Sequence, residues 1–161
     1  MTGVIMSNLL IRKAQREDTL LVLNCIKGIA EYEKLSHQVE ATPEILEKSL
    51  FDNHEASVLL GFVDEQIIGF ALYFYNFSTF KGKKGLYLED LFIYPKFRHK
   101  GYGKAFFKEL FSIAKQENCG RMEWVCLDWN KVAIDFYLSL GAKPLDDWTI
   151  FRIDENTLKQ L

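Results

Sequence analysis

Apolar residues recur with different periods along the chain, and each period predicts one type of element. Residues 9–13 are a short strand candidate. Residues 16–35 follow with helical spacing, and Asp18 or Thr19 can act as the N-cap. The predicted core face of this helix consists of Leu20, Leu23, Ile26, Ile29 and Ala30.

The next segments predict a second helix and then a hairpin. At residues 41–50 Thr42 can cap a helix, and Pro43 fits its first position. Two runs rich in β-forming residues, 56–63 and 66–77, flank a short polar turn of sequence DE. This arrangement is typical of two antiparallel strands.

The second half of the chain continues to alternate strands and helices. The predicted elements are a strand at 85–94, a helix from Gly101 to about Glu117, a strand at 121–127, a helix at 130–141 closed by Gly141, and a strand at 148–154. No repeat, low-complexity segment or linker interrupts the series. We therefore expect residues 1–161 to form a single α/β domain with a mixed sheet, and residues 1–8 to be flexible.

Composition and charge exclude several classes of protein. With 161 residues, 48% hydrophobic, the chain can build one well-filled core. Its net charge of −2 gives no overall attraction to nucleic acid or to an anionic membrane. The three cysteines and three histidines lack paired ligand spacing, so no metal site is expected. No signal peptide or membrane-spanning run is evident, which favours a cytoplasmic protein.

One candidate site is the stretch YPKFRHKGYGKAFF at residues 94–107, which crowds basic residues and glycines before a predicted helix. Unpaired amides at a helix N-terminus bind phosphate, and glycine lets the backbone approach a ligand closely. The stretch matches neither a Walker loop nor a dinucleotide fingerprint. From these residues alone, an anion site and a basic turn capped by glycine are equally open.

A second candidate site is the pair Glu89 and Asp90, adjacent carboxylates within an apolar strand. Strict alternation would put them on opposite faces, with Asp90 beside Leu88 and Phe92. A partly desolvated carboxylate can act as a general base or bind a cationic substrate. The alternative is an edge strand with solvated acids.

The predicted helix at 130–141 supplies a third candidate. Asn130 can cap this helix at a strand-to-helix junction, and Tyr137 lies two turns further along. A phenol in that position could donate a proton to a leaving group, although a core tyrosine is the alternative. Cys126 could be a nucleophile, but no partner base is evident, which favours a core thiol.

The order of these segments resembles the Gcn5-related N-acetyltransferase superfamily. Its R/Q-x-x-G-x-G/A motif is matched by Arg98, Gly101 and Gly103. The segments AEYEKLSHQV, STFKGKKGLYLEDLF and LDWNKVAIDFY further resemble the diamine/thialysine acetyltransferases. The resemblance implies a mostly antiparallel, twisted mixed sheet flanked by helices. It also implies a homodimer with swapped or shared C-terminal elements.

The resemblance implies a site for acetyl-CoA as cosubstrate, with no metal. The expected pyrophosphate loop consists of Arg98, His99, Lys100, Gly101, Tyr102, Gly103 and Lys104. The strand edge expected to pair with the pantetheine arm consists of Leu91, Phe92 and Ile93. On the other side of the arm, Asn130 and Ala133 are expected.

The resemblance also assigns roles in direct acetyl transfer. Glu89 matches the family position that accepts the amine proton through water. Tyr137 matches the tyrosine that protonates the departing CoA thiolate. The expected amine site consists of Tyr32, Glu33, Glu89 and Asp90.

Ser78 stands where the polyamine-preferring branch has an acidic residue. This departure disfavours spermidine and spermine and favours thialysine, lysine, ornithine or short diamines. The resemblance as a whole implies acetylation of a small primary amine of the thialysine, lysine, ornithine, diamine or polyamine type. Two alternatives stay open: an enzyme that acetylates a protein or peptide, and a CoA-binding module without catalysis.

Overall fold

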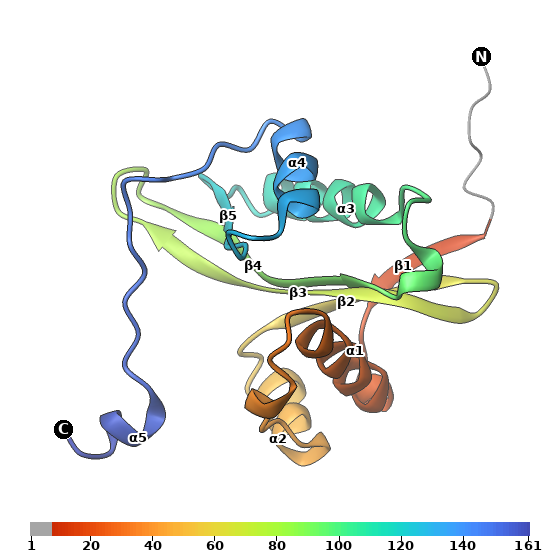
Figure 1. The fold of residues 1–161 in the computed structure, drawn as a ribbon, viewed down its shortest axis with the longest axis horizontal. Coiled ribbons are helices and arrows are strands. Elements are labelled where there is room, and N and C mark those ends of the chain that lie inside the picture. The colour runs from red at the N-terminus through yellow and green to blue at the C-terminus, as the bar shows by residue number, and fades with distance from the viewer. Residues whose placement is uncertain (1–7) are drawn as a thin grey trace. The chain divides into compact units, whose positions relative to one another are not determined.

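The computed structural model describes residues 8–161, which form two compact units, one ending at Val125 and the other spanning residues 126–161 (Figure 1). Most of the stretch expected to be flexible, residues 1–7, lies outside the described residues. Asn8, where the description starts, donates a side-chain hydrogen bond to Asp64 at 2.7 Å. No helix in residues 8–161 combines the length and the apolar character needed to cross a membrane.

The first unit is built on a five-stranded sheet. Its strands, in spatial order, are β1 (Leu9–Lys13), β2 (Ser57–Val63), β3 (Gln66–Ser78), β4 (Lys83–Ile93) and β5 (Met122–Trp124). Neighbours pair antiparallel except β4 and β5, which are parallel. The expected mixed, mostly antiparallel sheet is therefore confirmed.

The predicted hairpin is also confirmed, and its turn explains its register. β2 and β3 are joined by Asp64 and Glu65, whose φ angles are 48° and 64°. Two consecutive left-handed residues are the mark of a type I′ turn, whose twist matches that of the flanking strands. The two strands consequently pair from Val63 and Gln66 onward.

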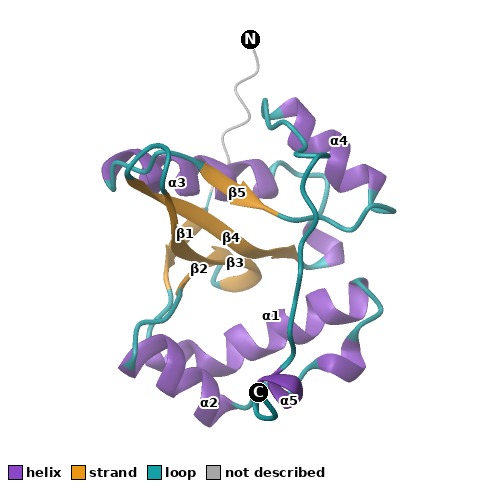
Figure 2. Cartoon of the chain, turned by 90° about the vertical axis from the view of Figure 1, so that its left-hand side faces the viewer, coloured by secondary structure: helices purple, strands orange, loops and turns teal. Residues whose placement is uncertain are grey.

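Helices cover both faces of this sheet (Figures 1 and 2). α1 (Thr19–Tyr32) and the short α2 (Pro43–Glu47), which Thr42 caps, lie on one face. α3 (Tyr102–Gln116) lies on the other. The core under α1 and α2 consists of Val22, Leu23, Cys25, Leu46, Leu50, Val58, Leu60, Phe70 and Phe92. The prediction that Leu20 lies on the core face of α1 is wrong, because its side chain is 63% exposed.

The core thiol of Cys25 is fully buried and donates a weak hydrogen bond to the hydroxyl of Tyr94 at 3.8 Å. Burial raises the pKa of this thiol to about 11. Cys25 is thus part of the core.

α3 packs through Phe106, Phe107 and Leu110, all completely buried. A Cβ atom at Gly61 of β2 would lie 2.8 Å from the Phe106 ring. The helix therefore approaches the sheet closely where β2 has no side chain.

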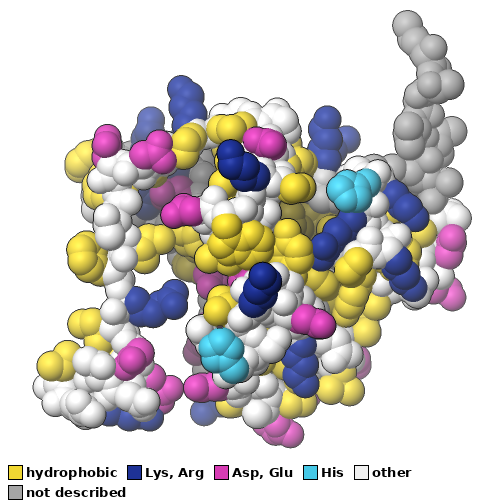
Figure 3. Space-filling view, in the orientation of Figure 1, with side chains coloured by type: hydrophobic (Ala, Val, Ile, Leu, Met, Phe, Trp, Pro, Cys, Tyr) yellow, Lys and Arg dark blue, Asp and Glu magenta, His cyan; other side chains and the backbone are white. Residues whose placement is uncertain are grey.

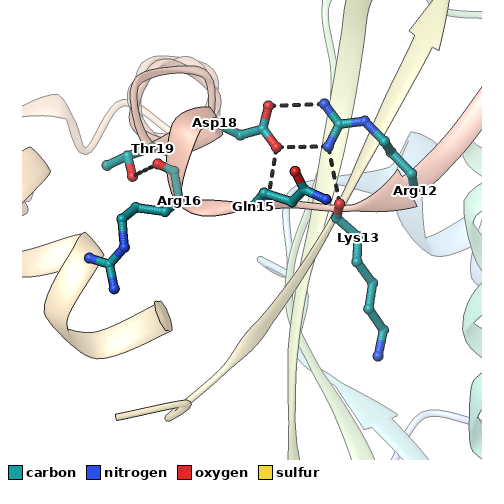
Figure 4. Close-up of polar contacts among 6 residues, drawn as sticks. All are labelled: Arg12, Lys13, Gln15, Arg16, Asp18 and Thr19. Atoms are coloured by element: carbon teal, nitrogen blue, oxygen red, sulfur yellow. Dashed lines mark hydrogen bonds and ion pairs between the residues drawn. The ribbon is translucent and has the colours of Figure 1, made fainter. Parts of the chain in front are cut away.

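The start of α1 is joined to β1 by a partly buried ion pair (Figure 4). Asp18 accepts two hydrogen bonds from Arg12, at 2.7 and 2.9 Å, and a third from the amide of Gln15 at 2.8 Å. The Arg12 guanidinium holds the pKa of the Asp18 carboxyl below its ordinary value. A carboxylate with three donors sets where the helix leaves the sheet.

The second unit contains α4 (Lys131–Ser139) and the short α5 (Glu155–Leu158). α4 ends as predicted at Gly141, whose φ of 89° suits the residue after a helix C-cap. The strand predicted at 148–154 is wrong, because these residues contain no strand. They run instead as an extended segment along which hydrophobic side chains stand out (Figure 3). A strand needs a neighbour for its backbone groups, and this segment pairs with none in residues 8–161.

Candidate active site

The loop between β4 and α3 offers a row of unpaired backbone amides. After a 3₁₀ turn at Pro95–Phe97, His99 and Gly101 adopt left-handed φ angles of 60° and 83°. Within the described residues, no backbone amide donates to a backbone oxygen between Arg98, bonded to Pro95, and Ala105, bonded to Gly101. The residues present therefore fit a pyrophosphate, which such amides and the helix dipole bind.

The charged side chains of this loop fall into two groups. His99, Lys100 and Lys104 are exposed, whereas Arg98 is half-buried. The Nε atom of Arg98 donates to the carbonyl oxygen of Ile93 at 2.8 Å. The loop cations are thus not equivalent, although the sequence placed them in one set.

β4, the strand predicted to pair with the pantetheine arm, has one edge without a strand partner over residues 91–93 among the described residues. On one side, residues 91–93 of β4 pair with residues 69–71 of β3. On the other side, the ladder with β5 ends at the pair Leu88 and Trp124. Within residues 8–161, the edge of β4 beyond Leu88 therefore meets no strand and is open to an extended ligand such as a pantetheine arm.

A β-bulge interrupts β4 at the catalytic candidate Glu89. Leu72 of β3 pairs with Asp90, and the next residue, Tyr73, pairs with Leu88, so Glu89 has no partner in the register. Leu72 and Tyr73 point to opposite faces, and their partners Asp90 and Leu88 consequently do so as well. The expectation that Asp90 shares a face with Leu88 is therefore wrong, because the bulge adds one residue to the alternation.

The bulge turns Asp90 toward the face covered by α1. Asp90 still lies on the same face as Phe92, which belongs to the core under that helix. Burial raises the pKa of the Asp90 carboxyl to about 7, with further contributions from Glu89 and Glu33. Burial also raises the pKa of Glu33. The first unit thus brings together three of the four residues predicted for the amine site.

The fourth residue, Tyr32, ends α1, and Glu33 is the C-cap of that helix. The guanidinium carbon of Arg98 lies 4.8 Å from the centre of the Tyr32 ring. The predicted amine site and the predicted pyrophosphate loop are therefore in contact. Sequence reasoning missed this contact, and no local pattern could have indicated it.

The other predicted residues belong to the second unit and are described within it. Asn130 caps α4, and its side-chain oxygen accepts a hydrogen bond from the amide of Ala133 at 3.2 Å. Tyr137 lies on the same helix, next to Phe136 with ring centres 5.7 Å apart. Cys126 is a half-buried thiol that forms no disulfide and donates to the carbonyl of Leu127 at 3.5 Å. In residues 8–161, no group of three or more His, Cys, Asp or Glu side chains is arranged to hold a metal ion.

A bulged β4 with one edge free of a strand partner, followed by an amide-lined loop, offers places for an extended ligand and for a phosphate group. The model of the acetyltransferase (GNAT) family matches residues 24–142, and the chain belongs to this family.

Relatives with assigned names extend the comparison. The chain is 33% identical to the thialysine N-epsilon-acetyltransferase of Bos taurus, over 97% of this chain and 98% of that protein. It is 36% identical to the L-ornithine N5-acetyltransferase of Arabidopsis thaliana, over 61% of this chain and 43% of that protein. An integron cassette protein from the mobile metagenome of V. cholerae has a similar solved structure. Its TM-score is 0.79 at 25% identity, covering 95% of this chain and 96% of that one.

The raised pKa of Asp90 predicts how stability depends on pH. Folding favours the protonated carboxyl, so the free energy of unfolding should fall as pH rises from about 4 to about 7. Asp90→Asn removes this loss and should stabilise the protein at pH 8 by up to about 4 kcal/mol, with the gain vanishing near pH 4. Urea unfolding at a series of pH values measures both quantities.

The matched control for this experiment is Glu65→Gln, which removes an exposed carboxylate in the β2–β3 turn. It should follow the wild-type pH profile throughout. If the free energy of unfolding of Asp90→Asn differed from that of the wild type by the same amount at every pH, the raised pKa of the buried Asp90 carboxyl would be contradicted.

Proposed function

We propose that this protein transfers the acetyl group of acetyl-CoA directly to a primary amine of a small molecule. The observation that carries the proposal is the structure of β4 on either side of Glu89. Its edge beyond Leu88 is open to a ligand, and the carboxylates of Glu33, Glu89 and Asp90 gather at the same level. One strand thus offers a place for an acyl donor and a place for a cationic acceptor.

On the donor side, the proposed contacts are made mainly by the backbone. The amides around Gly101 bind the pyrophosphate, and the exposed Lys100 and Lys104 add attraction. The β4 edge at residues 91–93 pairs with the pantetheine arm, and Asn130 and Ala133 flank it. When bound, acetyl-CoA supplies an activated acetyl thioester.

On the acceptor side, the chain must bind a cation and then remove its proton. A primary amine has a pKa near 10 and is protonated at neutral pH, so it cannot attack before it loses a proton. The clustered carboxylates attract the ammonium group, and Glu33 and Tyr32 hold the distal part of the amine. Glu89 accepts the proton at its carboxylate through water.

Tyr137 completes the proposed set by donating its phenolic proton to the sulfur that leaves. The transfer is direct, and no side chain becomes acetylated. Its position on α4, two turns beyond the cap at Asn130 and within residues 24–142 that the family model matches, supports this role.

The proposed acceptors are the side-chain amines of thialysine, lysine and ornithine, and short diamines. The names of the relatives from Bos taurus and Arabidopsis thaliana support them. Ser78, at the end of β3, is buried, and its hydroxyl accepts a hydrogen bond from the amide of Lys81 at 3.3 Å. It brings no negative charge to this position, which favours amino-acid side chains over spermidine and spermine.

Release of free CoA from acetyl-CoA across a panel of amines tests the proposal. The panel contains thialysine, lysine, ornithine, putrescine, spermidine and a lysine-bearing peptide. We expect turnover on one or more of the small amines. CoA release with the peptide alone would contradict the proposal and indicate a protein acetyltransferase. No CoA release with any acceptor, together with intact acetyl-CoA binding, would indicate a binding module without catalysis.

Tyr137→Phe tests the proposed acid. Loss of the phenolic proton donor should lower kcat by about a hundredfold, because general acid catalysis typically contributes that much or more. The dissociation constant for acetyl-CoA should stay near the wild-type value. Tyr75→Phe removes a hydroxyl from an exposed side chain of β3 and is the control. Unchanged kcat in Tyr137→Phe would remove this residue as the acid.

We also propose that the protein is a homodimer in which the extended segment 148–154 pairs with a second copy. Four of its apolar side chains, those of Trp148, Ile150, Phe151 and Ile153, are between 56% and 91% exposed. Apolar residues in an unpaired extended segment suit addition to another sheet edge. We further propose that the chain forms one catalytic domain. The three cysteines form no disulfide, which supports a cytoplasmic location.

Light scattering after size exclusion should give the mass of a dimer. Phe151→Ser should raise the dimer dissociation constant by about tenfold or more, because it removes a large apolar side chain from the interface. Arg152→Ser, its exposed neighbour, is the control and should leave the constant almost unchanged. A monomeric wild-type protein would refute the proposal.

A further inference from the structure

Arg98 differs from the other cations of the loop before α3. Lys96, Lys100 and Lys104 are exposed, whereas Arg98 is half-buried. Its Nε atom is committed to the carbonyl of Ile93, the last residue of β4, at 2.8 Å. The side chain is therefore held along the end of the strand.

The guanidinium of Arg98 stacks on aromatic rings. Its central carbon lies 4.8 Å from the centre of the Tyr32 ring and 5.6 Å from that of the Phe92 ring. Arginine combines a planar fork of donors with this kind of stacking, which lysine matches poorly. One side chain thus joins the end of β4, the loop and the end of α1.

The packing beneath this stack leaves little freedom. A Cβ atom at Gly28 of α1 would lie 2.6 Å from the Phe92 ring, so helix and ring are in direct contact. Phe92 in turn contacts Tyr94 with ring centres 5.1 Å apart. A displacement of the loop at Arg98 would consequently disturb the packing of Tyr32, one residue before Glu33.

We propose that Arg98 is a positioning residue that couples occupancy of the pyrophosphate loop to the order of the amine-binding end of α1. This proposal rests on the proposed function for the identity of the two sites. Binding of CoA fixes the loop, and through the stack of Arg98 on Tyr32 it also fixes Tyr32 and Glu33. Coupling of this kind is reciprocal, so a bound amine strengthens the binding of CoA by the same factor.

Hydrogen exchange with CoA alone tests the coupling without any need for turnover. In the wild type, saturating CoA should slow amide exchange in residues 30–35 by about three- to tenfold, the range of one partly exposed cation–π contact. Arg98→Met loses both the donor and the charge, and it should bind CoA without this slowing. Calorimetry establishes saturation for each variant.

Four further variants separate coupling from phosphate binding. Lys100→Gln should weaken CoA binding yet retain the slowing at saturation. Tyr32→Leu should abolish the slowing, and Arg98→Met in that background should change it no further. Arg98→Gln keeps a donor for Ile93 but no charge, and it should show the loss seen with methionine.

Steady-state kinetics supply an independent readout. Arg98→Met should raise the KM for the amine by about three- to tenfold, and this effect should disappear in the Tyr32→Leu background. Equal slowing of exchange in wild type and Arg98→Met, or none in the wild type, would overturn the coupling. Failure of the proposed function would show differently, as no turnover on any amine.

Discussion

Backbone groups that lie within a protein must find hydrogen-bond partners, and among the described residues one edge of β4 has no strand partner beyond Leu88. β5 is only three residues long and cannot cover the rest of its neighbour. A short fifth strand beside a long fourth strand therefore creates an edge that an extended ligand can complete. The proposed donor site depends on this mismatch in strand length more than on any particular side chain.

The bulge at Glu89 explains how two adjacent acids can serve different purposes. It reverses the alternation, so that Leu88 faces one layer of helices and Asp90 the other. Asp90 is thereby brought against the layer that contains Glu33, and its pKa rises to about 7. Because α1 starts from the ion pair of Arg12 and Asp18, its far end with Glu33 has a fixed position over the sheet.

The sequence allowed prediction of those features that depend on neighbouring residues. The turn at Asp64 and Glu65 and the helix end at Gly141 were predictable, because each requires a local backbone conformation. The bulge was not, because one extra residue in a ladder leaves no trace in the hydrophobic pattern. The strand expected at 148–154 failed because β-forming residues do not supply their own partner. The contact of Arg98 with Tyr32 depends on tertiary packing alone.

The thiol of Cys25 has a consequence for the chemistry that this protein can tolerate. A cysteine reacts as its thiolate, and a thiol whose pKa is about 11 is almost entirely protonated at neutral pH. It is also shielded by α1 on one side and the sheet on the other. Oxidants and alkylating agents can therefore reach Cys25 only after α1 has separated from the sheet. The rate at which Cys25 is modified consequently measures how often this part of the core opens.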